Sequence, residues 1–543
     1  MLASQTRPIR PDRLTPPQLR DELSRAGEIA LLDVREYGLF THGHLLLAAC
    51  APLWRLELLI DRLVPRSTTR VVLTDEDGSL LDAAADKLHY LGYSDMAVLD
   101  GGTSAWRAAG FEVFIDENVP GKALGEVVEA VAGTPHIDVG ELRRRQAAGE
   151  KLVVVDGRTP EEFYHFSLPG AHSLPNGELA YRIRELAPDP QTLVVVNCAG
   201  RTRSIIGAQT LINAGIPNPV VALKNGTMDW LLAGHQLEHA RRTELPEPTA
   251  QHINAARAGA ARLARRAGVA TIDAAGLADF VADAERTLYR FDIRTREEYE
   301  AGHLPGFRWA PGGQLVQATD GFLATRGARI VIADWDGVRA QGTAAWLLQL
   351  GGYDIYLYAP AADSIVEAGS EPVRVRRDPR APEVALLTPQ RADSLLADGS
   401  AVLIDVDNSL SFARQHSAGA KFIAPQRLLE WLPRFAPRRV ILTSRDGVLA
   451  RQIAGELRRR NLPAAALLGG ANAWVAAGLP TEQGGQDVLT GEDDARYGGY
   501  NVSDPERRER LFRDYLAWEI GLVEQLGRPG AELQFQVISA TAP

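Results

Sequence analysis

The strongest constraint on the fold is an arrangement of apolar segments that occurs four times along the chain. In each copy an apolar run ends in an aspartate, at Asp33, Asp156, Asp292 and Asp405. A second apolar run follows, and the residue directly after it lies 42 positions beyond the aspartate in three copies and 39 positions beyond it in the fourth. A spacing that is kept this closely predicts four tandem copies of one structural unit.

Each copy alternates short runs rich in β-branched residues with amphipathic segments, of which residues 80–88 are an example. This alternation predicts an α/β fold with a mostly parallel sheet flanked by helices. Three copies share a later motif, called the later mark below, in which a glycine-containing turn is followed by tryptophan; it occupies residues 101–106, 225–230 and 469–474. The third copy lacks this mark, so its C-terminal part is expected to differ.

We expect four domains with connecting segments. The predicted ranges are 10–120 for repeat 1, 134–240 for repeat 2, 241–270 for a helical linker, 271–372 for repeat 3, 384–482 for repeat 4 and 483–543 for a C-terminal tail. In the linker, an alanine- and arginine-rich run from Ala250 to Ala267 predicts a helix. The tail predicts a helix over residues 506–526, with an apolar face formed by Leu511, Phe512, Tyr515, Leu516, Ile520 and Val523.

One cysteine stands between a predicted strand and a predicted helix in repeat 2. Residues 193–197 form a short apolar run, Cys198 follows, and a helical pattern begins after Ser204. The N–H groups at a helix start favour an anion, and Arg201 and Arg203 add two positive charges within five residues of the sulfur. Both effects would lower the pKa of a cysteine from about 8.5 toward roughly 3.5–7.5. We therefore predict that Cys198 is a nucleophile with a lowered pKa.

A less specific interpretation has to be weighed against this one. A single cysteine after an apolar run is more often a small buried side chain than a catalytic one. Gly200 and the two arginines argue against that interpretation here, because a core position would need partners for these charges.

Composition limits the other classes of function. The net charge is −10 and no long basic block occurs, so nucleic acid is not an expected partner. No run of about 18 apolar residues occurs, and residues 1–8 have no apolar signal core, so we expect a cytoplasmic protein without membrane contact. The two cysteines, Cys50 and Cys198, are too few for a disulfide scaffold or a thiolate-rich zinc site.

Several short motifs carry a family resemblance. In repeat 2 they are Asp156-Gly157-Arg158, Glu161-Glu162-Phe163, Leu168-Pro169-Gly170-Ala171 and the Cys198 loop, and repeat 3 has a longer version of the first motifs in residues 292–306. Together with the later turn they resemble the rhodanese homology domain, four times over. Over about residues 10–482 the chain is similar to multi-repeat bacterial rhodanese-related sulfurtransferases.

The resemblance implies transfer of a sulfur atom through a persulfide on Cys198. It implies a substrate-binding loop made of Ala199, Gly200, Arg201, Thr202 and Arg203, with Arg158 as a further substrate ligand and Asp156 and Ser204 in supporting positions. Asp33 and Arg35 recur in repeat 1, which has no cysteine in the loop, so a structural ion pair between Asp156 and Arg158 is favoured over the role of Arg158 as a substrate ligand. The expected partners are a small anionic sulfur donor such as thiosulfate and an acceptor that is cyanide or a thiol, including a thiol on another protein. No metal or organic cofactor is expected. No separate base is expected either, provided that the thiol is already ionised.

The remaining repeats differ at the position of the nucleophile. Asp75, Asp334 and Ser444 stand where repeat 2 has Cys198, and none of these side chains can carry a persulfide. Repeats 1, 3 and 4 are therefore expected to be inactive. Cys50 lies outside the loop position and is expected to be a packed or surface thiol.

Three alternatives remain open. The donor could be 3-mercaptopyruvate, since a monoanionic keto acid would also bind arginine. The chain could be a regulatory module that carries a persulfide without turning over small molecules. A cysteine phosphatase is disfavoured, because only four residues separate Cys198 from Arg203 and the phosphatase branch of this fold has five.

Overall fold

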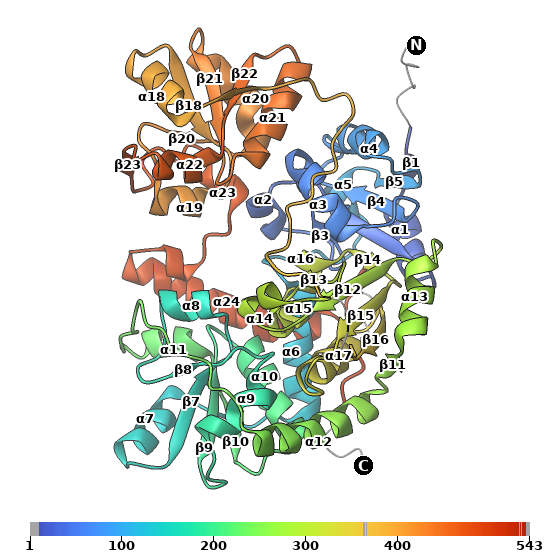
Figure 1. The fold of residues 1–543 in the computed structure, drawn as a ribbon, viewed down its shortest axis with the longest axis vertical. Coiled ribbons are helices and arrows are strands. Elements are labelled where there is room, and N and C mark those ends of the chain that lie inside the picture. The colour runs from blue at the N-terminus through green and yellow to red at the C-terminus, as the bar shows by residue number, and fades with distance from the viewer. Residues whose placement is uncertain (1–9, 362–363, 365, 532, 534, 539–543) are drawn as a thin grey trace. The chain divides into compact units, whose positions relative to one another are not determined.

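The computed structural model describes residues 10–361, 364, 366–531, 533 and 535–538 (Figure 1). The N-terminal residues that carry the prediction on targeting lie outside this range. The chain divides into two compact units. Unit 1 consists of Met1–Arg25, Ile29–Glu117 and Val373–Tyr497, and unit 2 of Ala26–Glu28, Asn118–Pro372 and Gly498–Pro543. Repeats 1 and 4 therefore belong to one unit, and repeats 2 and 3 to the other.

Repeat 2 is a five-stranded parallel sheet with helices between the strands. Its elements are β6 (His136–Ile137), α7 (Val139–Ala147), β7 (Leu152–Asp156), α8 (Pro160–His165), β8 (His172–Ser173), α9 (Leu179–Leu186), β9 (Leu193–Asn197), α10 (Thr202–Ala214), β10 (Val220–Leu223) and α11 (Gly226–Leu232). The strand order is β6-β10-β9-β7-β8, so β9 is central. Valines of β9 pack into the cores on both faces of the sheet, as expected for a strand in a covered parallel sheet.

Repeat 3 repeats this plan. Its elements are β11 (Ala270–Ile272), α13 (Ala274–Ala282), β12 (Leu288–Asp292), α14 (Arg296–Ala301), β13 (Arg308–Trp309), α15 (Gly312–Gln317), α16 (Thr319–Phe322), β14 (Thr325–Arg326), β15 (Arg329–Ala333), α17 (Arg339–Leu350) and β16 (Asp354–Tyr358). The strand order β11-β16-β15-β12-β13 matches that of repeat 2.

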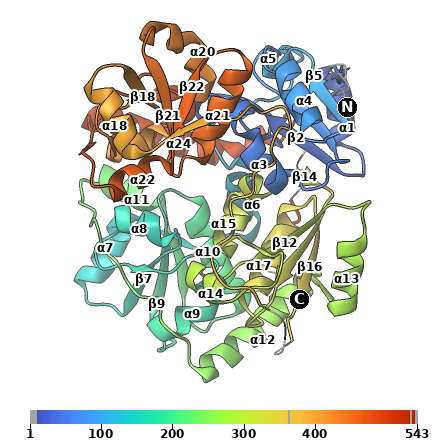
Figure 2. The same cartoon turned by 45° about the horizontal axis from the view of Figure 1, so that its top comes forward.

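Two further helices belong to unit 2 and pack against its repeats. The linker helix α12 (Ala250–Ala267) has the predicted bounds and lies against α9 and α17 (Figure 2). The helix α6 (Val119–Ala132) contributes Leu124 and Val128 to one core with residues of α10 and repeat 3. Repeats 2 and 3 thus share buried apolar surface.

Unit 1 contains the other two sheets. Repeat 1 consists of β1 (Asp12–Leu14), α1 (Pro16–Leu23), β2 (Ile29–Asp33), α2 (Tyr37–Thr41), β3 (Ala49–Cys50), α3 (Leu56–Leu63), β4 (Arg70–Thr74), α4 (Leu81–Tyr90), β5 (Met96–Leu99) and α5 (Gly102–Ala108). Repeat 4 consists of β17 (Ala385–Leu387), α18 (Pro389–Ala397), β18 (Ala401–Asp405), α19 (Ser409–Arg414), β19 (His416–Ser417), β20 (Lys421–Phe422), α20 (Leu428–Trp431), β21 (Arg439–Thr443), α21 (Val448–Arg459), β22 (Ala464–Leu467), α22 (Gly470–Ala476) and β23 (Thr481–Glu482). Their strand orders are β1-β5-β4-β2, with β3 beside β2, and β17-β22-β21-β18-β20.

The spacing in the sequence corresponds to one feature of all four sheets. The repeated aspartate is the last residue of β2, β7, β12 and β18, and the spaced position directly follows β4, β9, β15 and β21. In each sheet these two strands are hydrogen-bonded neighbours. The predicted fold class, four mostly parallel sheets flanked by helices and a helical tail, is therefore confirmed.

The tail follows repeat 4 with α23 (Gly491–Asp494), the short 3-10 turn η4 (Gly499–Asn501) and the helix α24 (Pro505–Gln525). Phe512 and Leu516 of α24 pack with Met228 of α11, so the helix covers repeat 2. The predicted apolar face is wrong in its last turns, because Ile520 and Val523 are 51% and 42% exposed. The buried positions there are Glu519 and Leu522. None of the described helices combines the length and the apolar character that crossing a membrane requires.

Close packing between α10 and α12 gives a first prediction. A Cβ atom on Gly259 of α12 would lie 2.2 Å from the carbonyl oxygen of Ala214, so Gly259→Ala should push the helices apart and destabilise unit 2 by about 1–3 kcal/mol. The same change at Gly521 of α24 meets no atom within 4 Å and should instead stabilise its helix by up to about 1 kcal/mol. Urea unfolding midpoints of the two variants should move in opposite directions. Equal shifts would contradict the prediction.

Candidate active site

Cys198 directly follows the central strand β9, and three residues separate it from α10. This is the strand-to-helix turn that the sequence predicts. The turn lies at the carboxyl end of a parallel sheet, where ligands of α/β folds bind. Cys198 itself is 2% exposed.

The start of α11 holds this turn in place. The N–H groups of Thr227 and Met228 donate to the carbonyl oxygens of Cys198 and Ala199, at 3.0 and 3.1 Å. Gly226 has a φ of +53°, and a Cβ atom on it would lie 2.2 Å from the Cys198 carbonyl oxygen. Only glycine fits this position without displacing the loop.

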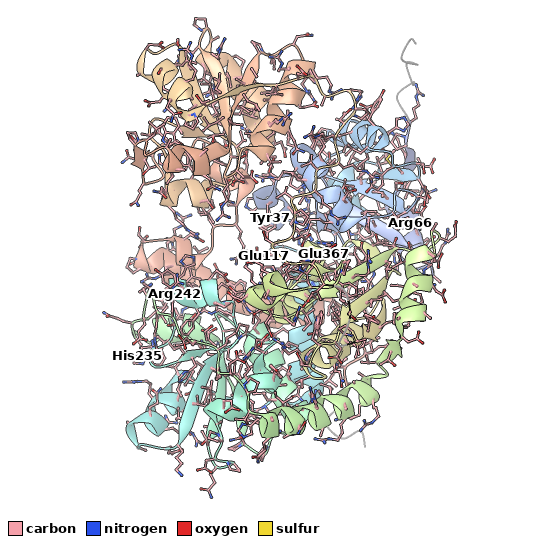
Figure 3. The ribbon with its side chains drawn as sticks, in the orientation of Figure 1. Tyr37, Arg66, Glu117, His235, Arg242 and Glu367 are labelled. Carbon is pink, nitrogen blue, oxygen red and sulfur yellow. The ribbon has the colours of Figure 1, made fainter. Side chains whose placement is uncertain are left out.

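The same support explains the later sequence mark. Thr103 N donates to Asp75 O at 2.8 Å in repeat 1, and Ala471 N donates to Ser444 O at 2.9 Å in repeat 4. The tryptophan of each mark is buried and donates its indole N–H to a backbone oxygen. In repeat 2 that tryptophan, Trp230, lies 4.7 Å from the ring of His235, which is labelled in Figure 3. In repeat 3 the corresponding region includes residues 362–363 and 365, which lie outside the described residues.

Repeats 1 and 3 show what this turn can bind. In repeat 1 the carboxylate of Asp75 accepts hydrogen bonds from the N–H groups of Gly78 and Leu80, at 2.6 and 2.8 Å. In repeat 3 the carboxylate of Asp334 accepts one from Gly337 N, at 2.8 Å. The backbone after the central strand therefore points N–H groups at an anionic side chain in the position of Cys198.

The prediction of a lowered pKa for Cys198 is wrong for the structure as it stands. Burial, the largest effect, raises the pKa of the thiol, and the charge of Glu519 raises it further. Arg203 and hydrogen bonding from Ser204 lower it, but not enough to offset burial. The sequence shows the two arginines but not how deeply the sulfur is covered.

Both arginines of the loop are paired with carboxylates. Arg203 donates two hydrogen bonds to Glu162, at 2.7 and 2.8 Å. Burial of Glu162 would raise its pKa, but the guanidinium of Arg203 outweighs burial and lowers that pKa to about 2. Glu162 is held by its own helix, since it completes a capping box with Thr159 at the start of α8.

Arg201 pairs with carboxylates of α6. It donates two hydrogen bonds of 2.8 Å to Glu126 and a third bond to Glu129. Burial raises the pKa of Glu126 to about 7, despite Arg201, and the neighbouring charges of Glu519 and Glu129 contribute to this increase.

Arg158 forms the structural ion pair that the sequence favours. Its Nε and Nη2 atoms donate to Asp156 at 2.9 and 2.8 Å, and both side chains are fully buried. Among the described residues, none accepts a hydrogen bond from Nη1 of Arg158. In repeat 1 the same atom of Arg35 donates at 2.7 Å to Glu76, the residue after Asp75. Ala199 stands at that position in repeat 2 and has no side-chain acceptor, so Nη1 of Arg158 lacks the partner that Arg35 has.

Two residues of the tail form hydrogen bonds with the loop, and neither was predicted from the sequence. The hydroxyl of Tyr500 donates to Ala199 O at 3.2 Å and lies 2.6 Å from the hydroxyl of Thr227, while its ring stacks on Phe166. Thr202 donates to Glu519 at 2.6 Å. Glu519 could have been noticed from its spacing, because it lies seven residues after Phe512 on the buried face of α24.

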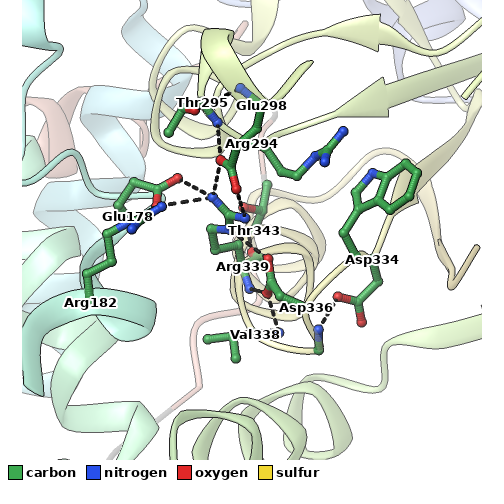
Figure 4. Close-up of polar contacts among 12 residues, drawn as sticks. Glu178, Arg182, Arg294, Thr295, Glu298, Asp334, Asp336, Val338, Arg339 and Thr343 are labelled. Carbon is green, nitrogen blue, oxygen red and sulfur yellow. Dashed lines mark hydrogen bonds and ion pairs between the residues drawn. The ribbon is translucent and has the colours of Figure 1, made fainter. Parts of the chain in front are cut away.

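Repeat 3 uses its loop arginine as a connection to repeat 2. Arg339 occupies the position of Arg203 and pairs with Glu298, the counterpart of Glu162, at 2.7 and 2.8 Å (Figure 4). It also pairs with Asp336 at 2.7 Å and with Glu178 of repeat 2 at 2.9 Å. The loop of repeat 3 is therefore occupied by structural contacts.

With this geometry, the chain can be compared with known proteins. The family model for the rhodanese-like domain matches residues 15–109, 138–233 and 276–365, which together are more than half of the chain. The chain belongs to the rhodanese-like family. Repeat 4 lies outside the matched ranges but has the same strand order as the three rhodanese-like domains that match.

A solved structure and a curated protein support this assignment to different extents. The crystal structure of thiosulfate sulfurtransferase from Pseudomonas aeruginosa is 44% identical, with a TM-score of 0.91, over 97% of this chain and 100% of that one. The HTH-type transcriptional regulator Rv0324 from Mycobacterium tuberculosis is 34% identical over 125 residues. Those residues are 23% of this chain, and they span about half the length of the regulator, 53%. The match to the Pseudomonas aeruginosa structure, which covers nearly all of both chains, supports a rhodanese-type sulfurtransferase.

The close approach of Gly226 to Cys198 gives a second prediction. Gly226→Ala should displace the Cys198 loop, because the added Cβ would collide with the Cys198 carbonyl oxygen. Gly234→Ala is the matched control, since Gly234 also has a positive φ, of +80°, but no atom within 4 Å of the added Cβ. The alkylation rate of Cys198, measured in a Cys50→Ser background, should change in the first variant only. Equal effects would show that the loop does not depend on this contact.

The charges around Cys198 give a third prediction. Arg203→Gln removes a cation that stabilises the thiolate, so the pKa of Cys198 should rise by about half a unit to one unit. Glu162→Gln removes the carboxylate that offsets this cation, so the pKa of Cys198 should fall by a similar amount. Thiolate absorbance as a function of pH, in a Cys50→Ser background, measures both shifts. Shifts of the same sign would contradict this account, and Arg144→Gln, at an exposed position of α7, is the control.

Proposed function

We propose that the chain is a sulfurtransferase in which Cys198 carries the transferred sulfur as a persulfide. One observation carries the proposal. In the equivalent loops of repeats 1 and 3, an aspartate carboxylate accepts backbone hydrogen bonds at the position where repeat 2 has Cys198. A thiolate and a persulfide are also anions, so the same loop can stabilise either of them.

The proposed reaction has two steps. In the first, the Cys198 thiolate attacks the outer sulfur of thiosulfate, the S–S bond of the donor breaks, and sulfite leaves with the electron pair. Cys198 then carries one additional sulfur and the negative charge. In the second step, the thiolate of an acceptor, or cyanide, attacks that outer sulfur, and the sulfur of Cys198 leaves as a thiolate. No oxidant or reductant is needed.

Thiosulfate, or a similar anionic donor, is the proposed source of sulfur. The similarity to a thiosulfate sulfurtransferase supports this choice. Nη1 of Arg158, the free donor near the loop, could bind the sulfonate end, together with the loop N–H groups of residues 199–203. Arg201 and Arg203 contribute less than the sequence suggests, because each is already paired. The proposed acceptor is a thiol or cyanide, and a protein thiol is included.

Cys198 has to remain a free thiol between turnovers, so we place the activity in the cytoplasm, which keeps thiols reduced. Repeats 1, 3 and 4 have Asp75, Asp334 and Ser444 in place of the nucleophile, and we assign them no transfer step. Repeat 3 instead supports repeat 2 through Arg339 and Glu178.

Intact-protein mass spectrometry tests the proposal and is the fourth prediction. After incubation with thiosulfate, the protein should gain about 32 Da, one sulfur atom, and cyanide should remove it. The Cys50→Ser variant should behave in the same way, whereas Cys198→Ser should gain nothing.

Other outcomes of that experiment identify the alternatives. A gain with mercaptopyruvate alone would keep the mechanism and change the donor. A stable persulfide without turnover would favour a regulatory module. Hydrolysis of a phenyl phosphate without any sulfur transfer would favour a phosphatase and overturn the proposal.

A further inference from the structure

The side of the Cys198 loop that faces the tail carries a buried acid with one free oxygen. Glu519 is 1% exposed, and its Oε1 accepts the hydrogen bond from Thr202. Among the described residues, none donates a hydrogen bond to its Oε2. A carboxylate oxygen that is buried without a partner is unfavourable, so this atom has an unmet need for a donor or a cation.

The free oxygen faces the loop that holds the nucleophile. A Cβ atom on Gly200 would lie 3.2 Å from Oε2 of Glu519 and 3.2 Å from Cε1 of Tyr515. The charge of Glu519 acts on Cys198 directly, since it opposes ionisation of the thiol. A group that approaches Gly200 therefore comes close to this carboxylate.

The cations near Glu519 also interact with other groups. Arg201, the loop cation that interacts with Glu519, is already held by Glu126 and Glu129 of α6. The charged and titratable groups on the elements around Glu519 are Lys122, Glu126 and Glu129 of α6, Cys198, Arg201 and Arg203 of the loop and Tyr515 of α24. Among them Lys122 lies over the rings of Tyr515 and Trp518, at 5.0 and 5.2 Å.

We infer that Glu519 determines which substrates react at Cys198, by disfavouring anionic reagents and favouring sulfur acceptors that carry an ammonium or another N–H donor. The acceptor class that fits is an amine-bearing thiol, whose ammonium would pair with Oε2 while its thiolate attacks the persulfide. The inference rests on the proposed function for the acceptor step. Its charge preference at Cys198 holds independently of that function.

Reagents of different charge test the preference directly. Cys198, in a Cys50→Ser background, should react fastest with a cationic methanethiosulfonate, more slowly with a neutral one and slowest with an anionic one. Glu519→Gln should reduce the ratio of cationic to anionic rates by about tenfold or more, equivalent to roughly 1.4 kcal/mol. Glu519→Asp should keep the order, and Glu524→Gln, at an exposed position of the same helix, should leave the ratio unchanged.

The two halves of sulfur transfer supply a second readout. In Glu519→Gln, loading by thiosulfate should become faster, because a negative charge near a dianion is removed. Discharge to cysteamine should become slower, whereas discharge to 3-mercaptopropionate should become faster. A variant that is merely damaged would slow all three reactions.

The outcomes separate the two proposals. An unchanged reagent ratio in Glu519→Gln, or a wild-type protein that reacts fastest with the anionic reagent, would overturn the role of Glu519. Failure of the wild-type protein to gain sulfur from any donor, with the charge order intact, would overturn the proposed function and leave the selection of charge in place. If the wild-type protein gains sulfur but Glu519→Gln leaves the acceptor preference unchanged, the proposed function stands and the role of Glu519 is overturned.

Discussion

The backbone hydrogen bonds from the start of α11 to the carbonyl groups of Cys198 and Ala199 are the contacts on which the site depends. They fix the loop after the central strand, and the loop in turn determines where its N–H groups point. The same contact recurs in repeats 1 and 4, which have Asp75 and Ser444 in place of the cysteine. The loop geometry is therefore a property of the fold, and the chemistry depends on the side chain placed in it.

The positive charge of the two loop arginines is largely offset by neighbouring carboxylates. Each guanidinium is paired with one or two carboxylates. Arg203 pairs with Glu162, whose pKa is lowered, and Arg201 pairs with Glu129 and with the more deeply buried Glu126, whose pKa is raised. A paired arginine holds its geometry but offers less charge to a substrate. Nη1 of Arg158 and Oε2 of Glu519 have no hydrogen-bond partner in the described part of the chain, so they are the more informative groups for specificity.

Repeats 2 and 3 show how one loop can serve chemistry or structure. Arg203 and Arg339 stand at equivalent positions, and each pairs with the glutamate of its own capping box. Arg339 additionally binds Glu178 across the boundary between the two repeats. A repeat without a nucleophile thus supports the neighbour that has one, and its buried ion pairs resist separation of the two domains.

The sequence by itself determined the tandem repeats, the class of fold, the linker helix and the position of Cys198, because these follow from local spacing and from apolar patterns within one segment. It also predicted the Asp156–Arg158 pair, whose members are two residues apart. The tertiary structure decided the partners of Arg201 and Arg203, the raised pKa of Cys198 and the placement of Glu519. These depend on contacts between distant segments, such as Thr202 and Glu519, which are 317 residues apart. Tyr500 and Glu519 reach the loop only because the tail packs on repeat 2, and no local pattern encodes which surface a helix will cover.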